Sequence, residues 1–138
     1  MSESESESEV RIPPLEPPFS DEHTKMLAKW MPPNSGQEPL ALFRMLIQHG
    51  EFAARMRPLG SGILGHGLLN PTDRELLILR TCAQCGAEYE WGVHVAAFSQ
   101  GVGLSPEQVT ATAQLDTSFE GWTDQQAALI HTVDALHH

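Results

Sequence analysis

The sequence predicts an all-α fold, and three observations carry this prediction. Apolar residues recur at helical spacing in several segments, no segment alternates apolar and polar residues as a half-buried strand would, and helix-start signals precede most of the apolar segments. A length of 138 residues is one domain by size, and an apolar content of 41% is ordinary for a soluble protein. We therefore expect a single helical domain preceded by a tail.

The tail is expected to span residues 1–18, to be disordered, and to be both acidic and rich in proline. Residues 1–9 alternate serine with glutamate after the initial methionine and offer almost no apolar surface to bury. Residues 10–18 contain four prolines, which favour an extended chain. The helical domain is then predicted to cover residues 19–138.

Two helices are predicted in the first half of the domain. Ser20, which is followed by two acidic residues, can cap a helix that ends before Pro32. A second helix is expected over about residues 39–56, and a glycine-rich stretch of low helix propensity begins at Pro58. The apolar residues expected to face inward in the second helix are Leu42, Phe43, Leu46, Ile47 and Phe52.

The central part of the chain predicts a pair of helices. Asn70 can cap a helix that has Pro71 at its first position, where the missing N–H would have had no partner in any case. This helix is apolar nearly all round, as in a buried helix, up to a break expected at Gly86. A second helix should follow and end at Gly101 or Gly103.

The same pair of helices carries the residues best suited to chemistry. Glu75 stands in an otherwise apolar helix, and a buried carboxylate needs a partner because its charge is costly to bury alone. The neighbouring helix offers His94, which lies four residues after Glu90 on one helical face. A histidine beside carboxylates can transfer protons near neutral pH. The nearest cations in sequence are Arg74 and Arg80, and helix geometry turns neither clearly toward Glu75.

Two capping boxes organise the end of the chain. Residues 105–108 open one helix, and residues 123–126 open another that reaches His138 without a glycine stop. The apolar residues of this last helix are Leu129, Ile130, Val133 and Leu136. Apolar faces left unfinished by such an end tend to be buried between subunits, so we expect a homo-oligomer.

A resemblance to a known family is carried by the run RELLILRTCAQCGAEYEWGVHVAAFSQGVGLSPEQV, which begins at Arg74. It looks like the core motif of the carboxymuconolactone decarboxylase family, which is similar to the alkylhydroperoxidase D-like proteins. The resemblance covers about residues 71–109, and looser similarity reaches back to about Ser20. It implies an alkylhydroperoxidase D-like helical bundle that assembles as a trimer or hexamer. Members usually continue with further helices, so the domain at 19–138 looks short at its C-terminus.

The resemblance also distinguishes two branches of that family by their site residues. The peroxidase branch carries a glutamate, then a Cys-x-x-Cys pair, then a histidine. Alignment on Glu75 and His94 places those two cysteines at Ala87 and Glu90, whereas the Cys-x-x-Cys pair of this chain begins five residues early, at Cys82. The two acids and the histidine that remain look like the non-thiol branch.

Three functions follow from these patterns. The first is an acid–base enzyme in which Glu75, Glu90 and His94 act on a small carboxylated or lactone-like metabolite, by decarboxylation or isomerisation. The second is a thiol-dependent alkylhydroperoxidase or peroxiredoxin-type activity in which Cys82 and Cys85 are oxidised to a disulfide, although both also suit small core residues. The third is a non-catalytic helical oligomeric scaffold.

Three further residues are candidates for contact with a substrate: Tyr89, Trp91 and His66. Tyr89 could hydrogen-bond in the site, Trp91 flanks the same turn and also suits a core position, and His66 stands among glycines that could line a pocket. No cofactor or metal is expected. A structural zinc site needs four ligands, and no second Cys/His pair has zinc-finger spacing.

Charge and hydropathy exclude several classes of partner. The net charge of −10 argues against nucleic acid and against anionic membranes. No apolar run approaches the roughly 18 residues that span a bilayer, and the serine–glutamate start is the reverse of a basic signal peptide. We therefore expect a cytoplasmic protein with mostly reduced cysteines that acts on a small molecule.

Overall fold

A computed structural model of the protein describes residues 10–31, 36–114 and 118–137. Across these ranges the chain forms seven α-helices and one π-helix and no strand, which confirms the predicted all-α class. The chain divides into two compact units, residues 1–66 and 67–138. None of the helices in the described ranges is long and apolar enough to cross a membrane.

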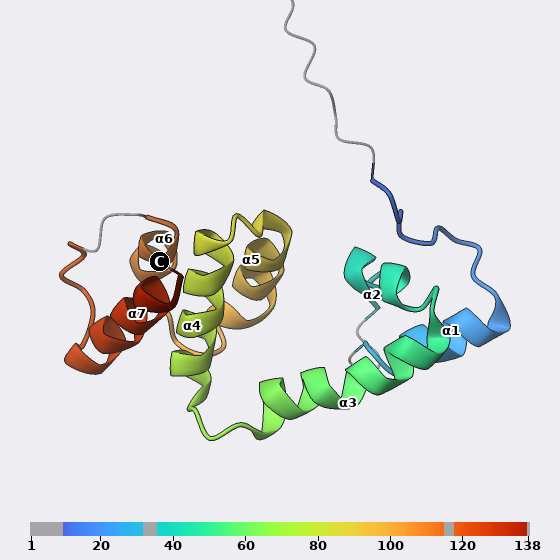
Figure 1. Ribbon diagram of the computed structural model, residues 1–138, viewed down its shortest axis with the longest axis horizontal. Coiled ribbons are helices and arrows are strands. Elements are labelled where there is room, and N and C mark those ends of the chain that lie inside the picture. Colours follow the sequence, from blue (N-terminus) through green and yellow to red (C-terminus); the bar gives the residue numbers. More distant parts are fainter. Residues whose placement is uncertain (1–9, 32–35, 115–117, 138) are drawn as a thin grey trace, which may run out of the picture. The chain divides into compact units, whose positions relative to one another are not determined.

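The first unit contains α1 (Asp21–Ala28), α2 (Ala41–Leu46) and α3 (Gly50–His66), coloured from blue to green in Figure 1. Ser20 caps α1 as predicted, because its side chain accepts a hydrogen bond from the His23 N–H at 3.1 Å. The core of this unit is formed by Leu27, Ile47 and Ala53.

The single helix predicted over residues 39–56 is wrong, because the chain turns between α2 and α3 at residues 47–49. His49 helps to restart the helix, since its Nδ1 accepts a hydrogen bond from the Phe52 N–H at 3.1 Å in the manner of a cap. The new start changes which side chains face inward. Phe52, which was predicted to be buried, is 49% exposed, and Ala53 is buried in its place.

The glycine-rich stretch is helical as far as His66, although its composition predicts low helix propensity. α3 continues through Pro58, which removes one backbone donor from the helix. Each glycine costs about 1 kcal/mol relative to alanine in a helix interior. The helix tolerates this penalty because it has already begun at Gly50, and adding a residue to an existing helix is far easier than nucleating a new turn.

The proline-rich part of the predicted tail is extended and bonded to α2. Arg44 Nη1 donates to the Leu15 carbonyl at 2.9 Å and to Glu16 Oε1 at 2.8 Å. Gln48 Nε2 donates to the Pro13 carbonyl at 2.8 Å. The serine–glutamate part, residues 1–9, lies outside the described residues.

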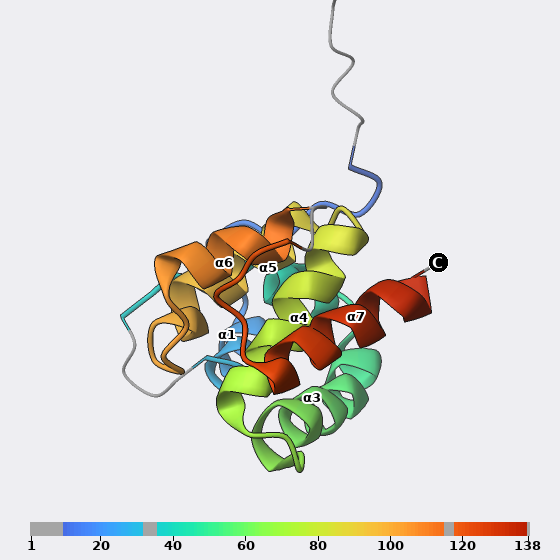
Figure 2. The ribbon, with the colours of Figure 1, turned by 90° about the vertical axis from the view of Figure 1, so that its left-hand side faces the viewer.

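The second unit is built around α4. Its elements are α4 (Pro71–Gln84), α5 (Glu88–His94), the π-helix η1 (Val95–Ser99), α6 (Pro106–Ala113) and α7 (Asp124–His137). Figure 1 shows α4 between α5 on one side and α6 and α7 on the other, and it packs against all three. In Figure 2, α7 crosses in front of α4. A side chain on α4 can therefore meet residues from most of the unit.

The predicted start and break of the central pair are confirmed, whereas the second helix ends slightly earlier than predicted, at Ser99. The Asn70 side chain accepts the Asp73 N–H at 2.9 Å, with Pro71 at the start of α4. Gly86 follows α4 with a φ of +64°, a conformation that glycine adopts without strain. The second helix is α5, which continues into η1 and then turns at Gly103.

Arg80 fastens α4 to both α6 and α7. Its side chain is only 3% exposed, and its Nε and Nη2 donate to the two carboxylate oxygens of Asp134 on α7 at 2.7 and 2.9 Å. Its Nη1 donates to the carbonyls of Thr112 and Gln114, at the end of α6. Paired, fork-like bonds of this kind fix orientation as well as distance. These bonds of Arg80 to Asp134, Thr112 and Gln114, called the clamp below, therefore fix α4 against both α6 and α7.

The clamp makes the free energy of unfolding depend on pH, because Asp134 must be ionised to pair with Arg80. The hydrogen bond from Arg80 holds the pKa of Asp134 below its ordinary value, despite the opposing effect of burial. The stabilisation is fully present above the unfolded-state pKa of about 3.9 and is lost as the pH falls from there through the lower folded-state pKa. We expect the difference in urea midpoint between the wild type and Asp134→Asn to shrink below about pH 4. A difference that stays constant into strong acid would contradict this assignment.

The capping box predicted at residues 105–108 is present at the start of α6. Ser105 Oγ accepts the Gln108 N–H at 3.2 Å, and Gln108 Oε1 accepts the Ser105 N–H at 3.1 Å. Thr123 and Gln126 make the same reciprocal pair at the start of α7, at 3.2 and 3.1 Å. Both boxes predicted from the sequence are confirmed.

We expect Ser105→Ala to lower the free energy of unfolding by about 1 kcal/mol, because it leaves the Gln108 N–H without its acceptor. The measurement is a urea titration with Ser61→Ala as the control. The Ser61 hydroxyl bonds a carbonyl within α3 and caps no helix start. Equal midpoints for the two variants would show that this cap contributes nothing.

Candidate functional site

Glu75 and His94 meet across the interface between α4 and α5. Glu75 Oε2 lies 2.7 Å from His94 Nδ1, and the glutamate side chain is 0% exposed. Glu75 is followed on α4 by the fully buried Leu76, and its carboxylate is buried where it cannot be solvated by water. The sequence-based expectation that Glu75 needs a partner and finds it in His94 matches this geometry.

Arg74 completes the pairing of the buried carboxylate. Its Nε donates to Glu75 Oε1 at 2.9 Å, and its Nη2 lies 2.9 Å from the same oxygen. The sequence-based expectation that neither arginine of α4 clearly faces Glu75 is therefore wrong for Arg74. It holds for Arg80, whose described bonds go to α6 and α7. Glu75 thus has a cation on one oxygen and an imidazole on the other.

Glu90 approaches the second nitrogen of His94. Its Oε1 lies 3.5 Å from His94 Nε2, and its side chain is 40% exposed, whereas that of His94 is 10% exposed. The ring of Phe98 lies 5.1 Å from the imidazole, centroid to centroid. One nitrogen of His94 is therefore held in the interior, and the other is directed toward a carboxylate that reaches water.

The two cysteines differ in environment. Cys82 is buried on α4, Cys85 is exposed at the end of the same helix, and neither forms a disulfide. Burial raises the pKa of the Cys82 thiol, and the nearby Glu90 carboxylate and Cys85 raise it further. A thiol with a raised pKa holds little thiolate at neutral pH, which makes Cys82 a poor first nucleophile.

A model of the carboxymuconolactone decarboxylase family matches residues 50–134, which is more than half of the chain. The chain belongs to the carboxymuconolactone decarboxylase family. The matched range begins with α3 and ends within α7, so it contains Glu75, Glu90 and His94. No curated protein and no solved structure matches the chain. Members of the family are often enzymes, either decarboxylases or peroxidase-like proteins.

The difference between the cysteines predicts selective labelling in this family member. We expect Cys85 to react with a thiol reagent on the order of tenfold faster than Cys82, because it is exposed and Cys82 is not. Cys82→Ser and Cys85→Ser, each leaving one thiol, assign the two rates. Fast modification of the thiol left in Cys85→Ser would contradict the burial of Cys82.

The predicted substrate-contact residues fall in three different places. Tyr89 is 52% exposed on the first turn of α5. Trp91 is half-buried, and its Nε1 donates to Thr112 Oγ1 at 3.1 Å, which ties α5 to α6. His66 is exposed at the end of α3, in the first unit. Trp91 therefore links two helices, and substrate contact by Tyr89, Trp91 and His66 stays a prediction.

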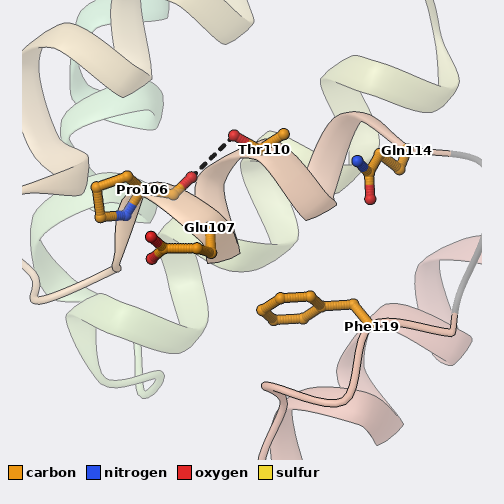
Figure 3. A pocket seen from close by; sticks show the side chains of 5 residues that line it. All are labelled: Pro106, Glu107, Thr110, Gln114 and Phe119. Carbon is orange, nitrogen blue, oxygen red and sulfur yellow. Dashed lines mark hydrogen bonds between the residues drawn. The ribbon is translucent and has the colours of Figure 1, made fainter.

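Two hollows are lined by other residues. One, of about 330 Å³, lies beside α6, and Figure 3 shows the ring of Phe119 facing the helix that carries Glu107 and Thr110, with Gln114 directly after its end. Thr110 Oγ1 donates a hydrogen bond to the Pro106 carbonyl at 2.9 Å. The other, of about 580 Å³, lies in the first unit and is lined by Arg11, Ile12 and Met45. Neither hollow includes a predicted site residue.

Metal ligation has no ready site in the part of the chain that the structure describes. Residues 10–31, 36–114 and 118–137 contain no group of three or more histidine, cysteine, aspartate or glutamate side chains placed to hold an ion. The acids nearest His94 instead contact its two ring nitrogens.

Proposed function

We propose that this member of the carboxymuconolactone decarboxylase family is an acid–base enzyme acting on a small carboxylated or lactone-like metabolite. The observation that carries the proposal is the 2.7 Å contact between His94 Nδ1 and the fully buried Glu75. A buried carboxylate that accepts a hydrogen bond from Nδ1–H orients the ring and stabilises the imidazolium. His94 Nε2 is then the atom that gives or takes a proton.

The proposed reaction needs one proton at carbon. When carbon dioxide leaves the substrate, the electron pair of the broken C–C bond stays on the neighbouring carbon. The protonated His94 donates its Nε2 proton to that carbon and becomes neutral, and water or Glu90 returns a proton to it. In an isomerisation, the same nitrogen takes a proton from one carbon and returns it to another. Glu75 stays ionised throughout.

The test is solvent deuterium incorporation. Small carboxylated lactones are incubated with the protein in D₂O, and the products are examined for carbon-bound deuterium and for carbon dioxide release. If the substrate is decarboxylated, we expect both carbon-bound deuterium in the product and release of carbon dioxide. If it is isomerised, we expect carbon-bound deuterium alone. Cys82→Ser should behave as the wild type. If no lactone in the panel exchanges or loses carbon dioxide above the buffer rate, the proposed substrate class is wrong.

A thiol peroxidase is the second candidate. It is supported by Glu90, which contacts His94 Nε2 at 3.5 Å and whose charge also raises the pKa of the Cys82 thiol. The Cys85 thiolate would attack a hydroperoxide, releasing an alcohol or water and leaving a sulfenic acid. Cys82 would then displace water from that sulfenic acid to give the disulfide, which an external dithiol reduces. Counting thiols before and after one equivalent of hydrogen peroxide tests it. Two thiols that persist for minutes would eliminate this candidate.

We propose that the protein works in the cytoplasm as a homo-oligomer, a trimer or hexamer. Apolar side chains that stand exposed on single helices support association: Leu59, Ile63 and Leu136. The two unpaired cysteines suit a reducing compartment. Light scattering after size-exclusion chromatography gives the mass directly, and a monomer at micromolar concentration would refute the assembly.

A further inference from the structure

We infer that Arg74 is a positioning residue: its guanidinium keeps Glu75 ionised and thereby decides which nitrogen of His94 carries the proton. The inference rests on the proposed acid–base role of His94 and deepens it. The geometry gives the starting point. The described contacts of Arg74 with Glu75 both go to Oε1, from Nε and Nη2 at 2.9 Å each, while Oε2 contacts the imidazole.

The burial of Glu75 is the reason a cation is needed. Its side chain is 0% exposed, so water cannot compensate for its charge, and an uncompensated carboxylate would take up a proton. The Arg74 side chain is 19% exposed, so its guanidinium can stay partly hydrated while it bonds the buried oxygen. A guanidinium cannot lose its proton in a protein, which makes it a permanent counter-charge.

The other charged groups of α4 with described partners are bonded elsewhere. Asp73 accepts hydrogen bonds from Asn70 and from Gln125 of α7. Arg80 is held by Asp134. Among the contacts described for Glu75, the positive charge comes from Arg74 and the imidazole from α5. Removing Arg74 therefore leaves the buried pair of Glu75 and His94 without its permanent cation.

The consequence is a change of tautomer. While Glu75 is ionised it can only accept, so a ring with a single proton carries that proton on Nδ1 and leaves Nε2 free to act as a base. Without the cation, Glu75 is protonated and donates to Nδ1. The ring must then hold its single proton on Nε2, the nitrogen that faces Glu90. Nε2 can then no longer act as the base, because it carries the proton. The loss of Arg74 would have this effect even though Arg74 need not touch the substrate.

The experiment reads the tautomer directly in the resting protein. Protein labelled with ¹⁵N-histidine is studied by NMR at a pH where the His94 ring holds one proton, and the His94 signals are assigned by their loss in His94→Gln. We expect the wild type to show the one-bond N–H coupling at Nδ1. In Arg74→Met the coupling should move to Nε2, and in Arg74→Lys, which keeps the charge, it should stay at Nδ1.

The matched control is Arg55→Met, which removes an arginine whose partner Glu51 is 79% exposed, and it should leave the His94 signals unchanged. A wild-type ring protonated at Nε2 would overturn the inference without any variant, even if Arg74→Met failed to fold. The same tautomer in the wild type and Arg74→Met, or a swap in Arg74→Lys, would overturn it as well. Because no substrate is involved, the tautomer can behave as expected even if the proposed reaction is wrong, and the two failures are distinguishable.

Discussion

His94→Gln should lower the turnover of a decarboxylated or isomerised substrate by about 10²–10⁴-fold, because the variant loses the group that delivers the proton. Glutamine has a similar volume and can still hydrogen-bond to the buried carboxylate, so the fold should be kept. The loss should appear in kcat rather than in KM if the proton moves in the rate-limiting step. Single-turnover measurement of deuterium incorporation separates the chemical step from product release.

Glu75→Gln should cause a loss of similar size through a different physical route. The amide oxygen can still accept from Arg74, but the amide nitrogen must then donate to His94 Nδ1, which places the ring proton on Nε2. A reversed tautomer with intact geometry is known to cost about 10⁴-fold in a histidine–carboxylate site. Both effects act on one unit, so the double variant should lose little more than either single one.

Cys82→Ser is the control that separates the two chemistries. The acid–base reaction should keep its full rate in this variant, because the thiol takes no part in the proposed step. A thiol peroxidase would instead lose its activity. Turnover that disappears with Cys82 and survives His94→Gln would contradict the acid–base function and favour the thiol alternative.

The parts of the fold that could be predicted are those fixed by neighbouring residues. A cap is decided within four residues, so Ser20, Asn70, Ser105 and Thr123 could each be recognised as helix starts from the sequence alone. The contact of Glu75 with His94 also had a signal in the sequence. An acid in an apolar helix requires a partner, and the adjoining helix offered one at the right spacing.

The remainder depended on features that sequence periodicity does not contain. At the break between α2 and α3, residues 47–49, the His49 imidazole accepts a hydrogen bond from a backbone N–H. The sequence pattern alone does not distinguish such a restart from a continuing helix. Successive residues on a helix point about 100° apart, so Arg74 was expected to turn away from Glu75. Its long side chain bends back to its neighbour, because the buried carboxylate attracts it. A buried acid next to an arginine in sequence is the signal that could have revealed this pair.

The ion pair of Arg80 with Asp134 could not be predicted from the sequence, for another reason. The two residues are 54 positions apart, and only the packing of α7 across α4 brings them together. Once the pair is known, its burial implies a large effect. Asp134→Asn should lower the free energy of unfolding by about 3 kcal/mol at neutral pH, because it leaves the buried Arg80 guanidinium without an anion.

Asn is the informative replacement because it keeps the shape of Asp134 and removes only its charge. The amide oxygen can still accept one bond from Arg80, but the amide nitrogen meets a guanidinium N–H, and two donors then face each other in the interior. A loss of about 3 kcal/mol is a substantial part of the 5–15 kcal/mol that holds a typical domain folded. It should appear as a lower urea midpoint with an unchanged slope.

Glu51→Gln provides the comparison for this loss, since it breaks an ion pair on the surface of α3 instead of in the interior. Both partners are highly exposed, at 74% for Arg55 and 79% for Glu51, so water replaces what the substitution removes and the midpoint should not move measurably. The contrast isolates burial as the cause, because each variant exchanges one carboxylate for its amide opposite an arginine. If the two variants had the same midpoint, the guanidinium of Arg80 would have to reach water, and the clamp could not be the contact that holds α7 on α4.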